Sequence, residues 1–538
     1  MAKVKYSSGY GPENKLPNSI VEGQLLFATD TRAKTLDADG VRIRFNPPGD
    51  WNETDPDSPA YIANKPVFDD IINDLKALRE IQGHMYGVVW DKTSSAMRRL
   101  FDSEDITLDT TNFVYSGSVN DSYDNPFDDI YPWSECKQCN VDLDIYRSLG
   151  VRDDIRDCVV SWCGDPDFTT DGSNGFVGRY TPEFWYYGFE DTRGKIVVVA
   201  DRPVEGFLHH KASIRSHGFA VDDGDGGVTS NDGQPLTNIA VSSIHSKAND
   251  CGFTLEDIYE LDAHVALYMV EFASTDAQSK LGNGCCSEVY AGDFTVLTAD
   301  TGATSFLLPA NIKNRCIPGA TLDFSTSKDG VVLTNRRTVV SAEDYDSTYC
   351  EVTFTPALDL TTDLYPSIHG KNNADSIGNK SGYVGVNGKN NAWYRGEILY
   401  GNRQRYILGI YRQTGTGHIW LATPETADNY DAINTSDHYD TEIAIPSNNI
   451  TAGGWNNVKE YSVPYGKLAA WGIISEAGNL VGDSQYVPYL STANSILEHG
   501  GTANDQNTYC GIFGARWSNN SNVSTIWAAS ASLLLKSK

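Results

Sequence analysis

The sequence TLEDIYELDAHVALYMVEF, residues 254–272, carries the clearest helical pattern in a chain that otherwise shows the short periods of β-strands. Its apolar residues recur every three or four positions and therefore share one face of a helix. Thr254 followed by Asp257 resembles an N-terminal capping box, which predicts a helix capped at Thr254. The apolar stripe consists of Leu255, Ile258, Leu261, Val265, Tyr268, Met269 and Phe272.

His264 lies inside this predicted helix, between Ala263 and Val265. A single histidine among apolar neighbours is more often a hydrogen-bonded core or surface residue than a catalytic group or a ligand. We therefore expect a structural role for His264.

The rest of the chain favours strands and turns. Its 538 residues include 48 Gly, 29 Tyr and 11 Trp but only 4 Met, a balance typical of β-rich, turn-rich proteins. Residues 221–228, VDDGDGGV, lack the position-12 carboxylate of an EF-hand loop and favour a solvated hairpin turn over a calcium site. The predicted fold class is mostly β with a few helices (α+β). Strands are expected near residues 88–90, 158–162, 184–187, 196–199, 294–297, 330–333 and 350–354.

The N-terminal region predicts a small β module followed by a short helix. Residues 21–29 and 41–45 alternate in polarity or nearly so, with Asp39-Gly40 as a turn between them. In residues 67–82, the apolar side chains step by 3, 4 and 3, which is the spacing of a coiled-coil seam. Two heptads fit a helix packed on its own domain almost equally well, but we favour a short trimeric neck. The seam residues are Phe68, Ile71, Leu75 and Leu78.

Charge and hydropathy exclude several classes of protein. With 42 Lys+Arg against 71 Asp+Glu, the formal net charge is −29. A chain this acidic is repelled by phosphate backbones and by anionic lipid headgroups. We find no apolar run long enough to span a bilayer and no apolar segment near the N-terminus typical of a secretory signal. We therefore expect synthesis in the cytoplasm, without nucleic-acid binding or membrane insertion.

The ten cysteines are interpreted as structural thiols. Cys136, Cys139, Cys158 and Cys163 form two close pairs, whose four thiolates suit tetrahedral zinc. The second pair, however, belongs to an apolar run that reads as a buried strand, where Cys behaves as a small hydrophobe. We therefore expect no metal and no cofactor, with zinc as the alternative.

No sequence motif indicates an enzyme. The chain has no Gly-x-Ser-x-Gly elbow, P-loop, dinucleotide-binding glycine motif or His-Glu-x-x-His. A glycosidase's two carboxylates meet in space rather than in sequence, so that option stays open. The segment 509–535 instead mixes Trp, Ser and Asn, which suit recognition of sugars and peptides. Trp517 in this segment is equally compatible with a core position in a polar connection between strands.

Several motifs, in order, resemble one family. Residues 87–100, GVVWDKTSSAMRRL, and 125–134, NPFDDIYPWS, are followed by 181–186, TPEFWY, and 206–215, GFLHHKASIR. The later matches are LGNG at 281–284, WYRGEILYGN at 393–402 and the tail 509–535. Together they resemble tail-fibre proteins of phages and prophages of gut bacteria, including those diversified by retroelements, which carry a C-terminal C-type-lectin-like domain. Residues 21–45 also resemble the N-terminal module of tail fibres.

The resemblance implies a virion tail fibre, made in the host cytoplasm, that recognises a glycan or protein on the host surface. Its expected domains are an attachment β module (1–60), a linker and neck (61–85), a β-rich domain (86–245) and a C-type-lectin-like domain with a β insertion (246–538). Other tail or baseplate proteins would bind the N-terminus of a homotrimer. A tail-borne polysaccharide depolymerase and a purely structural tail component are the alternatives. The expected receptor-binding residues are Tyr509, Phe513, Arg516, Trp517, Ser518, Asn519, Asn520, Asn522 and Trp527, with Trp517 as the anchor.

Overall fold

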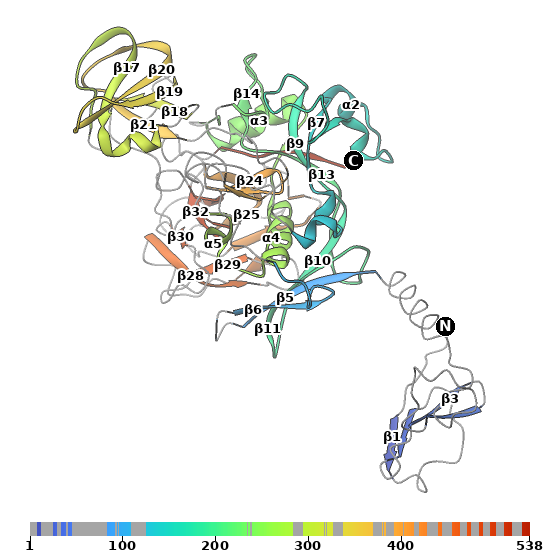
Figure 1. Ribbon diagram of the computed structural model, residues 1–538. Coiled ribbons are helices and arrows are strands. Elements are labelled where there is room, and N and C mark those ends of the chain that lie inside the picture. The colour runs from blue at the N-terminus through green and yellow to red at the C-terminus, as the bar shows by residue number, and fades with distance from the viewer. Residues whose placement is uncertain are drawn as a thin grey trace, which may run out of the picture. The chain divides into compact units, whose positions relative to one another are not determined.

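The chain forms two compact units, Met1–Gly83 and His84–Lys538 (Figure 1). No helix among the described residues is long and apolar enough to cross a membrane. The computed structural model describes residues 8–11, 25–28, 34–38, 41–45, 83–91, 94, 96–108, 125–233, 235–236, 239–282, 294–316, 318, 320–326, 337–369, 379, 381–383, 392–401, 403–413, 419–424, 426–427, 439–443, 454–462, 471–474, 484–487, 495–501, 511–518 and 530–537.

The first unit contains a four-stranded sheet in the order β1-β2-β3-β4. β3 and β4 pair antiparallel with Ala38 opposite Val41, and the predicted turn residues Asp39 and Gly40 lie outside the described residues. The predicted helical neck at 67–82, with Phe68, Ile71, Leu75 and Leu78, lies outside the described residues. The strands are β1 (Ser8–Gly11), β2 (Leu25–Ala28), β3 (Lys34–Ala38) and β4 (Val41–Phe45).

The second unit contains a five-stranded antiparallel sheet in the order β12-β10-β11-β5-β6. β11 reads GKIVVVA and is buried along nearly its whole length, because β5 and β10 flank it. The expected strands near 88–90, 184–187 and 196–199 are therefore confirmed. The strands are β5 (Met85–Asp91), β6 (Ala96–Phe101), β10 (Phe184–Asp191), β11 (Gly194–Ala200) and β12 (Leu208–His210).

A six-stranded sheet has the order β16-β33-β13-β9-β7-β8, and the C-terminal strand lies inside it. β33 pairs with β13 on one side and with β16 on the other. Its three leucines, Leu533 to Leu535, are all buried. The strands are β7 (Lys137–Val141), β8 (Val159–Trp162), β9 (Phe176–Thr181), β13 (Ser213–Ser216), β16 (Thr254–Leu255) and β33 (Leu533–Lys536).

This strand pairing crosses the predicted domain boundary at 245/246. β13 comes from the predicted β-rich domain, whereas β16 and β33 come from the predicted lectin-like domain, yet the three are neighbours in one sheet. One hydrophobic core likewise joins side chains from Tyr86 to Trp517. Sequence periodicity reports strands but not their partners, and therefore did not reveal that the two segments fold together.

Helix α4 (Ile258–Phe272) lies in the middle of this unit, and every one of its residues is buried. It contacts β5, β11 and β12 of the five-stranded sheet and also contacts β25 (Arg405–Arg412) of another sheet. The sequence pattern predicted that one face of this helix is buried, whereas the structure buries both faces. The predicted start is also corrected: the side chain of Asp257 caps α4 by accepting from Tyr259 N and Glu260 N, while Thr254 belongs to β16.

The other side of α4 packs against β25, which belongs to an eight-stranded sheet in the order β27-β26-β25-β31-β32-β30-β28-β29. β25 is buried at all eight positions and pairs with β31. The remaining strands are β26 (Ile419–Ala422), β27 (Tyr439–Ile443), β28 (Gly454–Ser462), β29 (Trp471–Ile474), β30 (Ser484–Val487), β31 (Ser495–His499) and β32 (Ala515–Ser518).

Two small sheets and several short helices complete the central part. The hairpin β14 (Val221–Asp222)–β15 (Val228–Thr229) confirms the predicted turn in the acidic glycine loop. A three-stranded sheet consists of β22 (Gly382–Tyr383), β23 (Ala392–Tyr394) and β24 (Glu397–Tyr400). The helices are α2 (Leu143–Ser148), α3 (Val241–Cys251), α5 (Ala277–Leu281) and the 3-10 helices η2 (Pro126–Asp129), η3 (Trp133–Glu135), η4 (Ile155–Cys158) and η5 (Ala310–Arg315).

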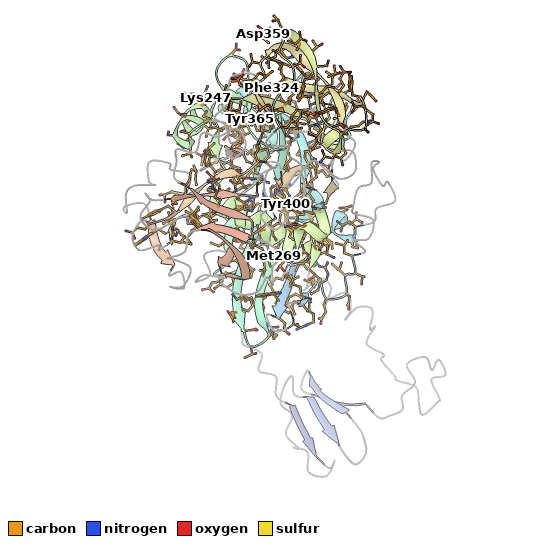
Figure 2. The ribbon with its side chains drawn as sticks, turned by 90° about the vertical axis from the view of Figure 1, so that its left-hand side faces the viewer. Lys247, Met269, Phe324, Asp359, Tyr365 and Tyr400 are labelled. Carbon is orange, nitrogen blue, oxygen red and sulfur yellow. The ribbon has the colours of Figure 1, made fainter. Side chains whose placement is uncertain are left out.

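A further antiparallel sheet, in the order β17-β20-β19-β18-β21, has a hydrophobic core of its own. Figure 2 labels Phe324 and Tyr365, which lie on its neighbouring strands β18 and β21. Phe306, Phe324 and Phe354 pack ring against ring at its centre. The strand predicted at 294–297 is wrong, because that segment has no strand pairing, and 330–333 lies outside the described residues. The strands are β17 (Asp300–Pro309), β18 (Thr321–Ser325), β19 (Arg337–Asp344), β20 (Tyr349–Leu360) and β21 (Tyr365–His369).

Candidate functional site

Helix α4 carries four ionisable side chains into the core: Glu260, Asp262, His264 and Glu271. Burying a charge is costly unless it is paired and hydrogen-bonded. These side chains must therefore contact polar groups of the surrounding elements. Two such groups of polar contacts lie beside α4, one around Glu260 and His264 and one around Glu271.

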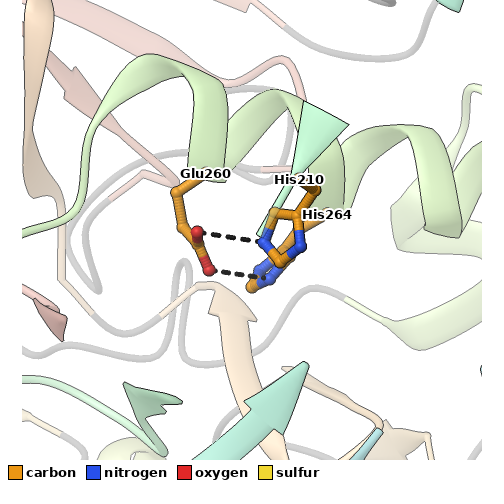
Figure 3. Close-up of side chains that lie close together, drawn as sticks. All are labelled: His210, Glu260 and His264. Atoms are coloured by element: carbon orange, nitrogen blue, oxygen red, sulfur yellow. Dashed lines mark hydrogen bonds and ion pairs between the residues drawn. The ribbon is translucent and has the colours of Figure 1, made fainter. Parts of the chain in front are cut away.

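The first is a compact group of three side chains, His210, Glu260 and His264, which we call the His–Glu–His cluster (Figure 3). Glu260 and His264 are four residues apart on α4 and so lie on the same side of the helix, while His210 ends β12. His210 Nε2 lies 3.1 Å from Glu260 Oε2, and His264 Nε2 lies 3.2 Å from Glu260 Oε1. All three side chains are buried.

The outer nitrogens of both imidazoles have acceptors. His210 Nδ1 lies 3.2 Å from the carbonyl oxygen of Pro182, and His264 Nδ1 lies 3.0 Å from Glu397 Oε1. A carbonyl and a carboxylate can only accept, so the proton in each contact belongs to Nδ1. The Nε2 atoms of both histidines therefore face the Glu260 carboxylate. The hydroxyl of Ser213 donates to Glu260 Oε1 over 2.8 Å and holds that carboxylate in place.

Behind the cluster lies a group of fully buried ion pairs, which we call the arginine–glutamate network: Arg179, Arg215, Arg405, Glu256 and Glu397. Arg215 Nε donates to Glu397 Oε2 over 2.7 Å, and its Nη1 contacts Glu256. Arg179 and Arg405 complete the pairing, at 3.2 Å from Glu397 and 3.3 Å from Glu256. With Glu260 included, three carboxylates balance three guanidinium groups.

These neighbours keep the carboxylates ionised despite their burial. Burial alone would raise the pKa of Glu397, but Arg179 and Arg215 hold that pKa far below its ordinary value. Burial would also raise the pKa of Glu260, and His210 and His264 hold it well below the ordinary range instead. Both side chains therefore act as acceptors at neutral pH.

A tight hairpin delivers Glu397 to this place. Tyr394 pairs with Glu397, so Arg395 and Gly396 form a two-residue connection between β23 and β24. Both connecting residues have positive φ, 47° and 89°, which is the geometry of a type I′ turn. The hairpin lies in the motif 393–402 that the sequence analysis matched to tail fibres, although the pattern did not indicate its buried charges.

The same hairpin supplies the second group of polar contacts, around Glu271. Arg395 binds Glu271 through two parallel contacts of 2.8 Å each, the bidentate geometry that favours Arg over Lys. Asn125 Nδ2 and the Tyr394 hydroxyl donate to the same carboxylate over 2.6 and 2.9 Å. Glu271 is thus fully hydrogen-bonded and has the character of a structural anchor.

A cavity of about 510 Å³ adjoins the His–Glu–His cluster. His210, Glu260 and Ser213 form part of its wall, and Tyr186, Phe207 and Tyr259 provide aromatic surface. At its rim the Lys536 ammonium lies 2.5 Å from Asp257 Oδ2, which joins the C-terminal strand to the start of α4. The cluster is therefore buried, but it borders a space large enough for solvent or a small ligand.

The cysteines that suggested zinc are separate from this cluster. Cys136, Cys139 and Cys158 are buried and Cys163 is partly buried, all as free thiols. Burial raises the pKa of the Cys158 thiol to about 11, and this thiol donates to Ile155 O over 2.9 Å. Among the described residues, the one group of three or more His, Cys, Asp or Glu whose ligand atoms converge is the His–Glu–His cluster.

The residues predicted to bind a receptor are only partly described. Phe513 and Trp517 are buried in the main core, at 2% and 0% exposure. Arg516 is one-quarter exposed, with Nε 4.0 Å from Glu498, and Ser518 ends β32. Tyr509, Asn519, Asn520, Asn522 and Trp527 lie outside the described residues.

The expectation that Trp517 is an exposed anchor is therefore corrected in favour of the core alternative. Trp517 pairs with Leu497 across β31 and β32, and strand alternation leaves Arg516 as the more exposed neighbour. The Asn-rich and Ser-rich residues that follow Trp517 suggested a loop. Trp517 itself, however, lies in strand β32 with its indole buried.

Both ends of the segment between Trp517 and Ser530 are fixed to this core. On one side, Gly500 N donates to Gly514 O over 2.8 Å, and His499 Nε2 donates to Ile512 O over 2.9 Å. On the other, Ser530 N donates to Gln404 O over 2.8 Å, and Ser530 O accepts from Tyr406 N over 3.0 Å. Any surface formed by the intervening residues is thus carried on a rigid base.

A scan against models of known protein families and a search of the curated proteins found no match to this chain. The cluster escaped the sequence analysis because its members lie at positions 210, 260 and 264 and are joined only by the fold. The i,i+4 spacing of Glu260 and His264 was the available signal.

Replacing Trp517 by Ala should destabilise the protein by about 3–5 kcal/mol, because the change leaves a large cavity in the core. Arg516→Ala, which truncates a partly exposed neighbour on the same strand, should cost about 1 kcal/mol or less. Denaturant titration of both variants measures the difference. Equal stability of Trp517→Ala and the unmodified protein would contradict the core position.

His499 should make the core sensitive to acid. Burial lowers its pKa to about 4, against about 6.5 in an unfolded chain. The unfolded state therefore takes up a proton first, and the contribution of neutral His499 is complete above about pH 6.5 and is lost as the pH falls towards 4. Between pH 7 and 4, the unmodified protein should lose on the order of 3 kcal/mol more stability than His499→Gln.

The measurement is the free energy of unfolding against pH for both proteins. His209→Gln serves as a control, because that side chain is exposed. A His499→Gln protein with the same acid dependence as the unmodified protein would contradict the assignment.

Proposed function

We propose that this chain is a receptor-binding protein of a bacteriophage tail fibre, which recognises a glycan or protein on the surface of its bacterial host. The ordered set of motifs that resembles tail fibres is the first support. The net charge of −29 is the second, because it disfavours nucleic acid and anionic lipid as partners. Its place would be the virion tail, after synthesis in the host cytoplasm.

The observation that carries the proposal is the way in which the C-terminal region is anchored. Residues 515–518 and 530–536 belong to two sheets of the same compact unit, and the intervening segment contains the predicted recognition residues Asn519, Asn520, Asn522 and Trp527. Binding residues are commonly carried on connections held by a rigid scaffold. Amides and an indole together suit hydroxyl-rich or peptide ligands.

The correction at Trp517 refines this proposal. Phe513 and Trp517 act from the core as supports of the segment, and recognition moves to the residues that follow. A C-type-lectin-like domain, with residues 294–369 as its β insertion, remains the finer interpretation of the second unit. A homotrimer formed through 67–82, attached to the tail through the N-terminal unit, completes the proposal.

Adsorption to cells tests the proposal directly. We expect the triple variant Asn519→Ala/Asn520→Ala/Asn522→Ala to fold with an unchanged thermal midpoint and to lose about 2 kcal/mol or more of binding, roughly 30-fold. Labelled full-length protein is titrated onto a panel of gut-bacterial strains. Tyr345→Ala is the control, because it truncates an exposed aromatic in the β19–β20 connection of a sheet with a separate core and should bind normally.

Three results would contradict parts of this proposal. Normal adsorption by the triple variant would remove the segment from the binding surface. New reducing ends released from purified surface polysaccharide would favour the depolymerase instead. Light scattering that gave the mass of a single 59.0 kDa chain would exclude the trimer.

A further inference from the structure

We propose that the His–Glu–His cluster binds one divalent transition-metal ion, best matched by Zn²⁺, through Nε2 of His210, the Glu260 carboxylate and Nε2 of His264. This inference is independent of the proposed function. It also departs from the sequence expectation that the chain needs no metal, which considered only the cysteines.

The first step is the direction of the lone pairs. Because Nδ1 of His210 donates to Pro182 O and Nδ1 of His264 donates to Glu397, each ring presents Nε2 to Glu260 either as an N–H donor or, in its neutral form, as a lone pair that can bind a metal ion. With both rings neutral, two nitrogen lone pairs and a carboxylate point at one another inside the protein (Figure 3). Such a group needs a cation between its members, either a proton on an imidazole or a metal ion.

The second step is spacing. Zinc binds imidazole nitrogen and carboxylate oxygen at about 2.0–2.2 Å in a tetrahedron, which separates the ligand atoms by roughly 3.3–3.6 Å. In the cluster, the two Nε2 atoms lie 3.1 and 3.2 Å from oxygens of Glu260, and one ligand atom from each residue lies within 4.8 Å of the other two. Small side-chain rotations are sufficient to seat the ion.

The third step is the surrounding support. Metal-bound histidines nearly always donate their other nitrogen to a carboxylate or a backbone carbonyl, which fixes the tautomer and the ring orientation. His264 has the carboxylate form of this contact, to Glu397, and His210 has the carbonyl form, to Pro182. Ser213 orients the third ligand by donating to Glu260. All three ligands are thus held in place by neighbouring groups.

One positive group lies close by. Arg179 Nη1 is 3.0 Å from His264 Nε2, but it is also 3.0 Å from Thr181 Oγ1 and 3.2 Å from Glu397 Oε1. Its two hydrogens therefore have acceptors other than the imidazole. Glu397 faces both Arg179 and His264 and offsets the guanidinium charge beside the site.

The adjoining cavity leaves space for a fourth ligand beside two of the three residues, His210 and Glu260. The Ser213 hydroxyl lies 3.5 Å from His210 Nε2, and the adjoining cavity of about 510 Å³ borders His210 and Glu260. Two histidines and one glutamate with an exchangeable fourth position form the ligand set typical of zinc sites that retain a bound water. The cavity also provides the entry path that a buried metal requires.

The test uses full-length protein stripped of metal and titrated with ZnCl₂ by calorimetry, with zinc per chain measured by elemental analysis. We expect one ion per chain and a thermal midpoint that rises with zinc concentration. Glu260→Gln and His264→Gln should each weaken binding by at least about 10-fold. His209→Gln, the exposed residue next to the cluster, should bind zinc like the unmodified protein.

Cobalt replaces zinc in a second measurement that needs no variant. Co²⁺ held by nitrogen and oxygen should show ligand-field bands without thiolate charge-transfer absorption, whereas binding by the cysteines would show that absorption. The proposal is overturned if the protein binds no zinc. It is also overturned if Glu260→Gln and His264→Gln bind zinc as tightly as the unmodified protein, or if the cobalt spectrum shows thiolate charge-transfer absorption. Absence of zinc binding would leave a proton as the cation that joins the cluster.

Discussion

The second unit depends on the contact of Arg215 with two carboxylates, Glu256 and Glu397, inside a core that excludes water. Glu256 immediately precedes the N-cap of α4, Glu397 follows the β23–β24 hairpin, and Arg215 lies on β13. Removing one partner of a buried ion pair leaves the other charge unpaired and destabilises the protein by about 3–5 kcal/mol. The contact therefore specifies how three segments that are distant in sequence come together, rather than adding a surplus of stability.

Several features of the unit follow from this arrangement. Because α4 is covered on all sides, its ionisable residues are forced into the core, and the sheets around it must supply matched charges. The same requirement brings His210 and Glu397 next to His264. The C-terminal strand lies within the six-stranded sheet. Residues 515–518 and 530–536 thus belong to the same compact unit as α4. The proposed cation site and the residues that flank the proposed recognition segment thus belong to one compact unit.

Periodicity predicted part of the local structure. It predicted the strands around Val88, Phe184 and Ile196 and the turn in the acidic loop, but the strand at 294–297 was wrong. The start of α4 was misplaced because Thr254 and Asp257 both suit a cap, and only the pairing of Thr254 with Leu534 decides between them. Trp517 illustrates the same limit, since its burial depends on β31.

The candidate site was less accessible to sequence reasoning than the fold. Residues 210, 260, 264 and 397 come from three elements, β12, α4 and β24, and only the i,i+4 spacing of Glu260 and His264 is visible in the sequence. The motif around residues 393–402 was singled out by resemblance, but its chemistry, a type I′ turn that aims Arg395 and Glu397 at α4, needed the three-dimensional arrangement. Composition and charge disfavour polyanionic partners, and this expectation stays a prediction.

Hydrogen exchange in increasing denaturant tests most directly the claim that these distant segments form one cooperative core. Amides of α4, of residues 392–412 and of residues 530–537 should lose protection together at one denaturant concentration, because the buried charges tie them to a single opening event. Peptides from β17 and β20, whose core is separate, provide the internal reference. Loss of protection in residues 530–537 or 392–412 while α4 stays protected would contradict the account.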